Sequence, residues 1–176
     1  MSARSLLEDN RQVQRAVELI GLGARLQMLQ SETALPYERL LRLYKEVAGK
    51  SPSKGQLPFS TDWFVSWQPN IHASLYFNIY AYLLKTSPLD DVDAIIKAYR
   101  LYASEVATQG VEPLLSITRA WRLVRFVDSG MLTTMRCCRC GGHFVNHAYE
   151  LERDYVCGLC EPPARAGKAR RRGAIH

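Results

Sequence analysis

A chain of 176 residues can form one hydrophobic core, or one core with a small appendage. Its 47% hydrophobic and 23% charged residues are typical of a soluble globular protein and exclude a chain that is disordered throughout. The net charge of +6 is unevenly distributed, because residues 161–176 contain five cations and one acid.

Two stretches bear on localisation. The first ten residues contain charges and no long apolar run, which predicts no signal peptide, a cytoplasmic location and reduced cysteines. Residues 63–84 contain no charged side chain and approach the length of a membrane span, but several polar residues and a proline interrupt them. We therefore expect a buried region there and no membrane partner, with His72 as a core histidine that has a hydrogen-bond partner.

Three helices are predicted in the first third of the chain, over 6–21, 24–31 and 36–47, from the spacing of their apolar residues. A short helix, a tight turn and a helix with cations on its outer face form a helix-turn-helix arrangement, here over 24–47. The expected DNA-facing side chains of the third helix are Tyr37, Arg39, Arg42 and Lys45. The alternative is a solvated or partner-facing helix, which has the same pattern.

The loop over 49–58 carries two lysines and is interpreted as a linker, with phosphate contact as the alternative. Helices are predicted after it over 70–85, over 91–106 with Asp90 as N-cap, and over 113–130. The first of these has one apolar stripe of Ile71, Leu75, Ile79 and Tyr82 and further apolar residues on its other sides, so we expect it to be buried on several sides or to meet another subunit. In the last helix a basic row faces solvent or extends a nucleic-acid surface, and its members are Arg119, Arg122 and Arg125.

All five cysteines lie between positions 137 and 160. They include two C-x-x-C pairs separated by sixteen residues, and such pairs fold into tight knuckles that each present two thiolates to a metal. The predicted ligands of one structural Zn²⁺ ion are Cys137, Cys140, Cys157 and Cys160.

Other arrangements of the same residues are open. Cys138 can replace Cys137 only with a single residue before Cys140, and His143 or His147 can serve only if a cysteine is free. A disulfide framework would leave one odd cysteine, and a catalytic metal needs an open position that four thiolates do not leave. A structural metal is therefore expected, which would order the chain beyond residue 130.

The expected fold class is mainly α, with a helical body over 1–130 whose helices at 70–129 bind a partner. A small zinc-ribbon-like lobe with four cysteines is expected over 131–161, and a flexible basic tail over 162–176 that binds phosphate or only aids solubility. Within the lobe, a hairpin beside the metal is predicted from Phe144, Val145, Tyr155 and Val156. Three nearby cations are expected to offset the thiolate charge, and they are Arg136, Arg139 and Arg153.

No glycine loop for phosphate, Ser-His-Asp set or paired carboxylates occurs in a plausible context, so the sequence gives enzymatic activity no support. The chain resembles the FlhC family, the zinc-containing subunit of the bacterial flagellar master transcriptional activator. The matching stretches are 18–20, 22–29 (LGARLQML), 57–64 (LPFSTDWF), 94–102 (AIIKAYRLY), 118–121 (TRAW), 123–127 (LVRFV) and the cysteine segment.

The resemblance implies a mostly helical cytoplasmic protein that joins FlhD in a hetero-oligomer, binds promoter double-stranded DNA upstream of flagellar operons and helps recruit RNA polymerase. It also implies that the four cysteines of the two pairs hold zinc. It assigns no individual DNA contacts, for which we expect Arg139 in addition to the third-helix residues. The rival interpretation is a zinc-stabilised protein-interaction module that touches no nucleic acid.

Overall fold

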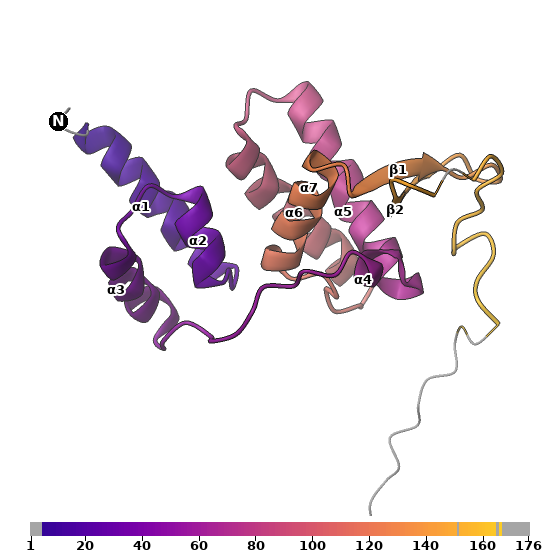
Figure 1. Cartoon of the computed structure of the whole chain (residues 1–176). Coiled ribbons are helices and arrows are strands. Elements are labelled where there is room, and N and C mark those ends of the chain that lie inside the picture. The colour runs from indigo at the N-terminus through magenta and orange to yellow at the C-terminus, as the bar shows by residue number, and fades with distance from the viewer. Residues whose placement is uncertain (1–4, 151, 165, 167–176) are drawn as a thin grey trace, which may run out of the picture.

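The computed structural model describes residues 5–150, 152–164 and 166. Within these residues it contains seven helices and one two-stranded antiparallel sheet, so the mainly α prediction is confirmed (Figure 1). In the part described, no helix has the length and apolar character needed to cross a membrane. The cations of the predicted tail, from Arg165 onward, lie outside the described residues.

The first three helices are α1 (Leu6–Gly21), α2 (Leu26–Glu32) and α3 (Tyr37–Ala48). Their bounds lie within two residues of those predicted, because each has a regular apolar face and a clear stop. α3 ends at Gly49, whose φ of +66° suits glycine and lets its N–H bind the Lys45 carbonyl. α3 packs against both α1 and α2, and Figure 1 shows these three helices as one group.

The remaining helices are α4 (Asp62–Val65), α5 (Trp67–Thr86), α6 (Asp91–Thr108) and α7 (Ile117–Asp128). α5 packs along α6, and α7 packs against both. The predicted N-cap of α6 is confirmed, since the Asp90 carboxylate accepts a hydrogen bond from the Asp93 N–H at 2.9 Å. His72 is half-buried with Nδ1 2.6 Å from the Tyr102 hydroxyl, so its predicted hydrogen-bond partner exists.

Two helices differ in detail from the sequence prediction. α7 begins at Ile117 rather than 113, because the Ser116 side chain accepts from the Arg119 N–H and caps the helix there. The apolar stripe of α5 named from the sequence is not its most buried face, since Tyr82 is 66% exposed and the other three members are only half-buried. The α5 side chains that are buried are Asn70, Ala73, Ser74, Tyr76, Tyr80 and Leu83.

The sheet pairs β1 (Leu132–Arg136) with β2 (His143–His147). The predicted hairpin partner of β2, residues 155–156, is therefore wrong, because the strand before the first cysteine pair takes that place. Tyr155 instead accepts the Cys138 N–H through its carbonyl, and its ring lies 6.4 Å from that of Phe144. Tyr155 and Phe144 both pack beside the cysteines.

The sheet is attached to the helical body along α5. Asn70 and Asn78 donate to the carbonyls of Val145 and His143, and the Ser74 hydroxyl accepts the Val145 N–H. These three α5 residues are spaced four apart and so lie on one face of the helix. They satisfy backbone groups of β2, while the side chain of Val145 joins the main core.

Candidate functional site

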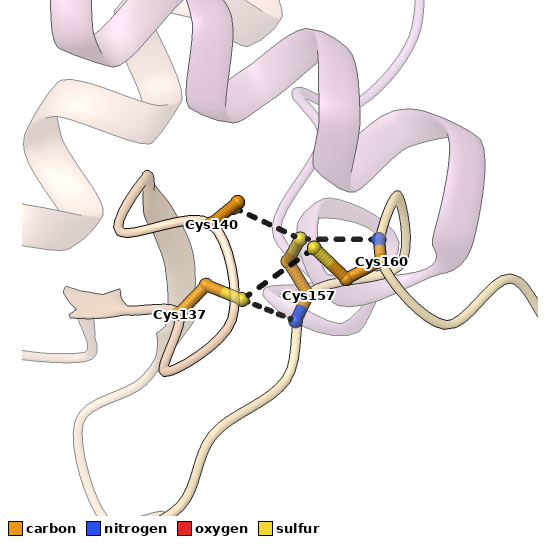
Figure 2. Close-up of side chains that lie close together, drawn as sticks. All are labelled: Cys137, Cys140, Cys157 and Cys160. Carbon is orange, nitrogen blue, oxygen red and sulfur yellow. Dashed lines mark hydrogen bonds between the residues drawn. The ribbon is translucent and has the colours of Figure 1, made fainter.

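Four cysteine sulfurs converge at the end of the sheet, as Figure 2 shows. They belong to Cys137, Cys140, Cys157 and Cys160, and all lie within 4.8 Å of one another. The Cys137 and Cys160 sulfurs are 3.9 Å apart, and those of Cys140 and Cys157 are 3.7 Å apart. These distances are too long for disulfide bonds, and all five cysteines are free.

Each cysteine pair lies in a tight backbone turn. In the first, the Gly141 N–H binds the Cys137 carbonyl at 2.9 Å and the Cys137 N–H binds the Gly142 carbonyl at 2.8 Å. Gly141 has a φ of +74°, a conformation that side chains rarely adopt. In the second turn, the Glu161 N–H binds the Cys157 carbonyl at 3.0 Å. The turns therefore hold both sulfurs of each pair toward the same point.

Hydrogen bonds within the cluster shift the pKa values of two thiols in opposite directions. Backbone N–H groups of Cys140 and Cys157 donate toward the Cys137 thiol and lower its pKa to about 6. Hydrogen bonding with the thiols of Cys157 and Cys140 raises the pKa of Cys160 to about 12. A cation at the centre of the cluster would favour the thiolate form of its ligands.

The sulfur spacing fits a tetrahedral ion. A metal–sulfur distance of about 2.3 Å separates the sulfurs of a tetrahedral site by about 3.8 Å. The two measured sulfur–sulfur contacts lie on either side of this value. The four cysteines could therefore hold a metal ion.

The second knuckle contacts the helical body at its glycine. The Trp67 indole N–H donates to the Gly158 carbonyl at 2.9 Å. A Cβ atom on Gly158 would lie only 2.7 Å from Trp67 Cδ1, so no larger residue fits without a shift. This contact was not predicted, because the spacing of the two pairs says nothing about what covers them.

The other candidate ligands lie elsewhere. Cys138 and His143 are exposed, and neither belongs to the cluster of four sulfurs. His147 is buried beneath Tyr149, with its Nε2 atom 3.3 Å from an Asp62 carboxylate oxygen. It therefore has a partner at the junction of the sheet with α4.

The predicted DNA-facing residues divide between two sides of α3. Tyr37 and Lys45 line a groove with the loop segment 51–55. Arg39 and Arg42 line a different groove, which also contains Glu38 and Glu46. The two terminal guanidinium nitrogens of Arg39 each lie 2.8 Å from an oxygen of the Asp9 carboxylate. Arg42 is exposed.

Arg139, the remaining DNA-contact candidate, is in the first cysteine turn and lies 3.3 Å from Glu161. This ion pair is exposed on both sides, so water and salt screen it strongly. Arg139 therefore stays available to another anion.

The basic row of α7 also divides. Arg125 lies within 3.1 Å of three carboxylates, those of Glu32, Asp91 and Asp128. Arg119 instead lies over the Trp63 ring, 4.0 Å from its centroid, and Arg122 lies 4.5 Å above the Phe126 ring. A spacing of three does not keep side chains on one line of a helix, so their surroundings differ.

Comparison with known proteins places the whole chain in one family. The family model "Flagellar transcriptional activator (FlhC)" matches residues 1–173. The flagellar transcriptional regulator FlhC of Verminephrobacter eiseniae (strain EF01-2) is 64% identical over 172 residues, which cover 98% of this chain and 93% of that protein. FlhC of Yersinia enterocolitica is 53% identical, with 97% and 89% covered. From the extent of these matches, the chain belongs to the FlhC family of flagellar transcriptional activators.

Proposed function

We propose that this protein is a DNA-binding subunit that activates flagellar operons in the cytoplasm, in a hetero-oligomer with FlhD, and helps recruit RNA polymerase. The family match over residues 1–173 carries this proposal. FlhC is a family of transcriptional regulators rather than of enzymes, and we propose no catalytic activity.

The metal in the proposed function is one structural Zn²⁺ ion held by the four clustered cysteines. Thiolate sulfurs in a tetrahedral set suit zinc, and four of them leave no position for a substrate or water. When bound, the ion would close the lobe by joining its two turns. The protein's own contribution is the pair of turns and the Trp67–Gly158 contact that orients the lobe on α5.

DNA contact is proposed through α3, the second helix of a helix-turn-helix. Tyr37 and Lys45 are exposed on one of its sides and Arg42 on another, which supports this role. Arg39 would exchange its Asp9 partner for a phosphate, and Arg139 would exchange Glu161 in the same way. Such exposed pairs contribute little free energy, so an exchange costs little.

The test is binding by the full chain co-expressed and purified with FlhD. Fluorescence anisotropy should show tighter binding to a duplex from upstream of a flagellar operon than to an unrelated duplex. Affinity should fall steeply as salt rises, because cations on phosphates release counterions. Transcription from the same promoter by RNA polymerase should increase when the complex is added. Co-purification with FlhD but equal, negligible affinity for both duplexes would favour a protein-interaction module.

A further inference from the structure

The segment between α3 and α4 is folded against the body by several polar side chains. Figure 1 shows it as an extended connection that runs from one helix group to the other. The Arg25 guanidinium donates to the Gln56 carbonyl, Gln27 donates to the Gly55 carbonyl, and Arg122 donates to the Pro58 carbonyl. This segment is therefore positioned by α2 and α7 rather than acting as a free linker.

Five cations lie on or beside this segment. Lys45 and Lys54 line one groove, which also contains Gly55 and Gln27. The Arg25 guanidinium donates to the carbonyl of Gln56, the next residue of the segment, and its backbone N–H donates to the hydroxyl of Thr118, which precedes Arg119 in α7. We call this set the basic strip, and its members are Arg25, Lys45, Lys54, Arg119 and Arg122.

The basic strip differs from most ion-paired cations of the protein in its lack of acidic partners among the described residues. Within residues 5–150, 152–164 and 166, no carboxylate lies at ion-pair distance from any of its five members. Among the residues that the structure describes, those lining the groove of Lys45 and Lys54 include no acid. Burial and the positive charge of Arg25 lower the pKa of Arg119, as expected for cations placed together without a counterion.

Other cations of the body differ in this respect. Arg15 is bound to Asp90 and Asp93, and Arg125 to three carboxylates. Lys97 and Arg100 line a groove that contains Glu18 and Asp93. Lys45 of the basic strip lies in the same groove as Tyr37 of α3, so the strip adjoins the proposed recognition helix.

We propose that the basic strip binds the sugar-phosphate backbone of double-stranded DNA beside α3. The inference rests on the proposed function and extends it from one helix to four further cations, those at positions 25, 54, 119 and 122. Each of the three arginines is already held by a backbone carbonyl or an aromatic ring. They therefore lose little side-chain entropy on binding, and their remaining N–H groups can donate to phosphate oxygens. Contacts of this kind fix the register of a recognition helix.

The test compares three forms of the full chain, each co-purified with FlhD. The first is wild type, and the second is the strip variant Arg25→Gln, Arg119→Gln and Arg122→Gln. The third is a control variant with the same change in charge on exposed cations outside the strip, Lys85→Gln, Lys97→Gln and Arg100→Gln. Anisotropy on an operon duplex and on an unrelated duplex is measured across a salt series, with circular dichroism as the check of folding.

The strip variant is expected to bind both duplexes on the order of 30-fold more weakly, because phosphate contacts carry no sequence information. Its slope of log affinity against log salt should fall by about 2 to 3, close to one per lost phosphate contact. The control variant should keep the wild-type slope. Lys54→Gln changes an exposed side chain, leaves the packing of the arginines untouched, and should lower the slope by about 1.

A wild-type complex that binds DNA while the strip variant and Lys54→Gln keep its slope would overturn the strip alone. If the strip variant loses FlhD on purification, the surface is a protein interface and the proposal is wrong. Failure of the wild-type complex to bind either duplex would instead overturn the proposed function, and the strip with it.

Discussion

Gly158 lies where the second cysteine turn meets Trp67, and here the absence of one methyl group matters. In Gly158→Ala the new Cβ would lie 2.7 Å from the indole Cδ1 atom, so the turn or the ring must move. We expect a loss of about 1–3 kcal/mol in the free energy of unfolding and weaker metal retention. Chemical denaturation and metal content after dialysis measure the two effects.

The matched control is Gly21→Ala near the end of α1, where an added Cβ meets nothing within 4 Å. Alanine favours a helix over glycine, so this variant should be as stable as wild type or slightly more stable. Equal stability of Gly158→Ala and Gly21→Ala would show that the Trp67 contact is too loose to orient the lobe.

Three polar residues of α5 have partners that the sequence did not reveal. Asn70 and Asn78 interrupt an apolar stretch of sequence, which argued against a membrane span. The sequence did not show which groups they bind. In the structure they and Ser74 bind the backbone of β2. Their spacing of four is a signal for a shared helix face that sequence reasoning could have used.

At the scale of elements, α3 provides the test of the helix-turn-helix. Arg42→Ala should lower affinity for an operon duplex about 3- to 10-fold, because it removes an exposed cation from the proposed recognition helix. Arg39→Ala should act in the same direction, but it also breaks the Asp9 ion pair. Anisotropy at fixed salt measures both.

The control for nonspecific loss of charge is Arg100→Ala. It removes an exposed cation of α6 that is paired with Glu18 of α1. Affinities for Arg39→Ala and Arg42→Ala that match wild type would remove this side of α3 from the DNA interface. The groove side, with Tyr37 and Lys45, would then be the remaining candidate.

Contacts between α2 and α7 hold the first three helices against the rest of the helical body. Glu32 is nearly buried and accepts from the Trp121 indole at 2.6 Å and from Arg125 at 3.0 Å. The Arg25 N–H adds a bond to the Thr118 hydroxyl. These polar contacts join the helix-turn-helix to the helix that carries Arg119 and Arg122, so the two parts of the basic strip keep their spacing.

At the scale of the whole molecule, the described residues form two unequal cores. The larger contains side chains from all the helices together with Leu132 and Val145 of the sheet. The smaller consists of Cys137, Phe144 and Cys157 with a few half-buried neighbours. So small a cluster cannot offset the conformational entropy of its segment, whereas a bound metal can.

Removal of the metal should therefore unfold the lobe and spare the helical body. After chelation we expect far-ultraviolet circular dichroism to stay close to that of the untreated protein, while trypsin gains access to Arg139 and Arg153. DNA affinity should fall because the lobe no longer holds Arg139 in place. Cys157→Ser should reproduce the effect, and Cys138→Ser, which changes an exposed thiol outside the cluster, should not.

A freshly purified protein without metal, or one with unchanged proteolysis after chelation, would contradict this account. Because Leu132 and Val145 belong to the larger core, the sheet should stay attached to α5 at its near end. The expected loss of order begins after Arg136, which is later than the boundary at 131 predicted from the sequence.

Local signals in the sequence determined most of the helices, the cap at Asp90 and the gathering of four potential metal ligands in one short segment. These features depend on neighbours within a few positions, so spacing and capping chemistry suffice to predict them. Resemblance to FlhC, carried by the same local stretches, was confirmed by the family match.

Only the tertiary structure decided which side of α5 is buried, which strand pairs with β2 and which arginines of α7 are neutralised. α5 is apolar on most sides, so its periodicity could not select the buried face; α6, α7 and the sheet select it by packing. Arg119 and Arg125 have the same local pattern but different neighbours, because the acids near Arg125 come from α2 and α6. Charge pairing between distant segments depends on the fold, and the sequence pattern does not contain it.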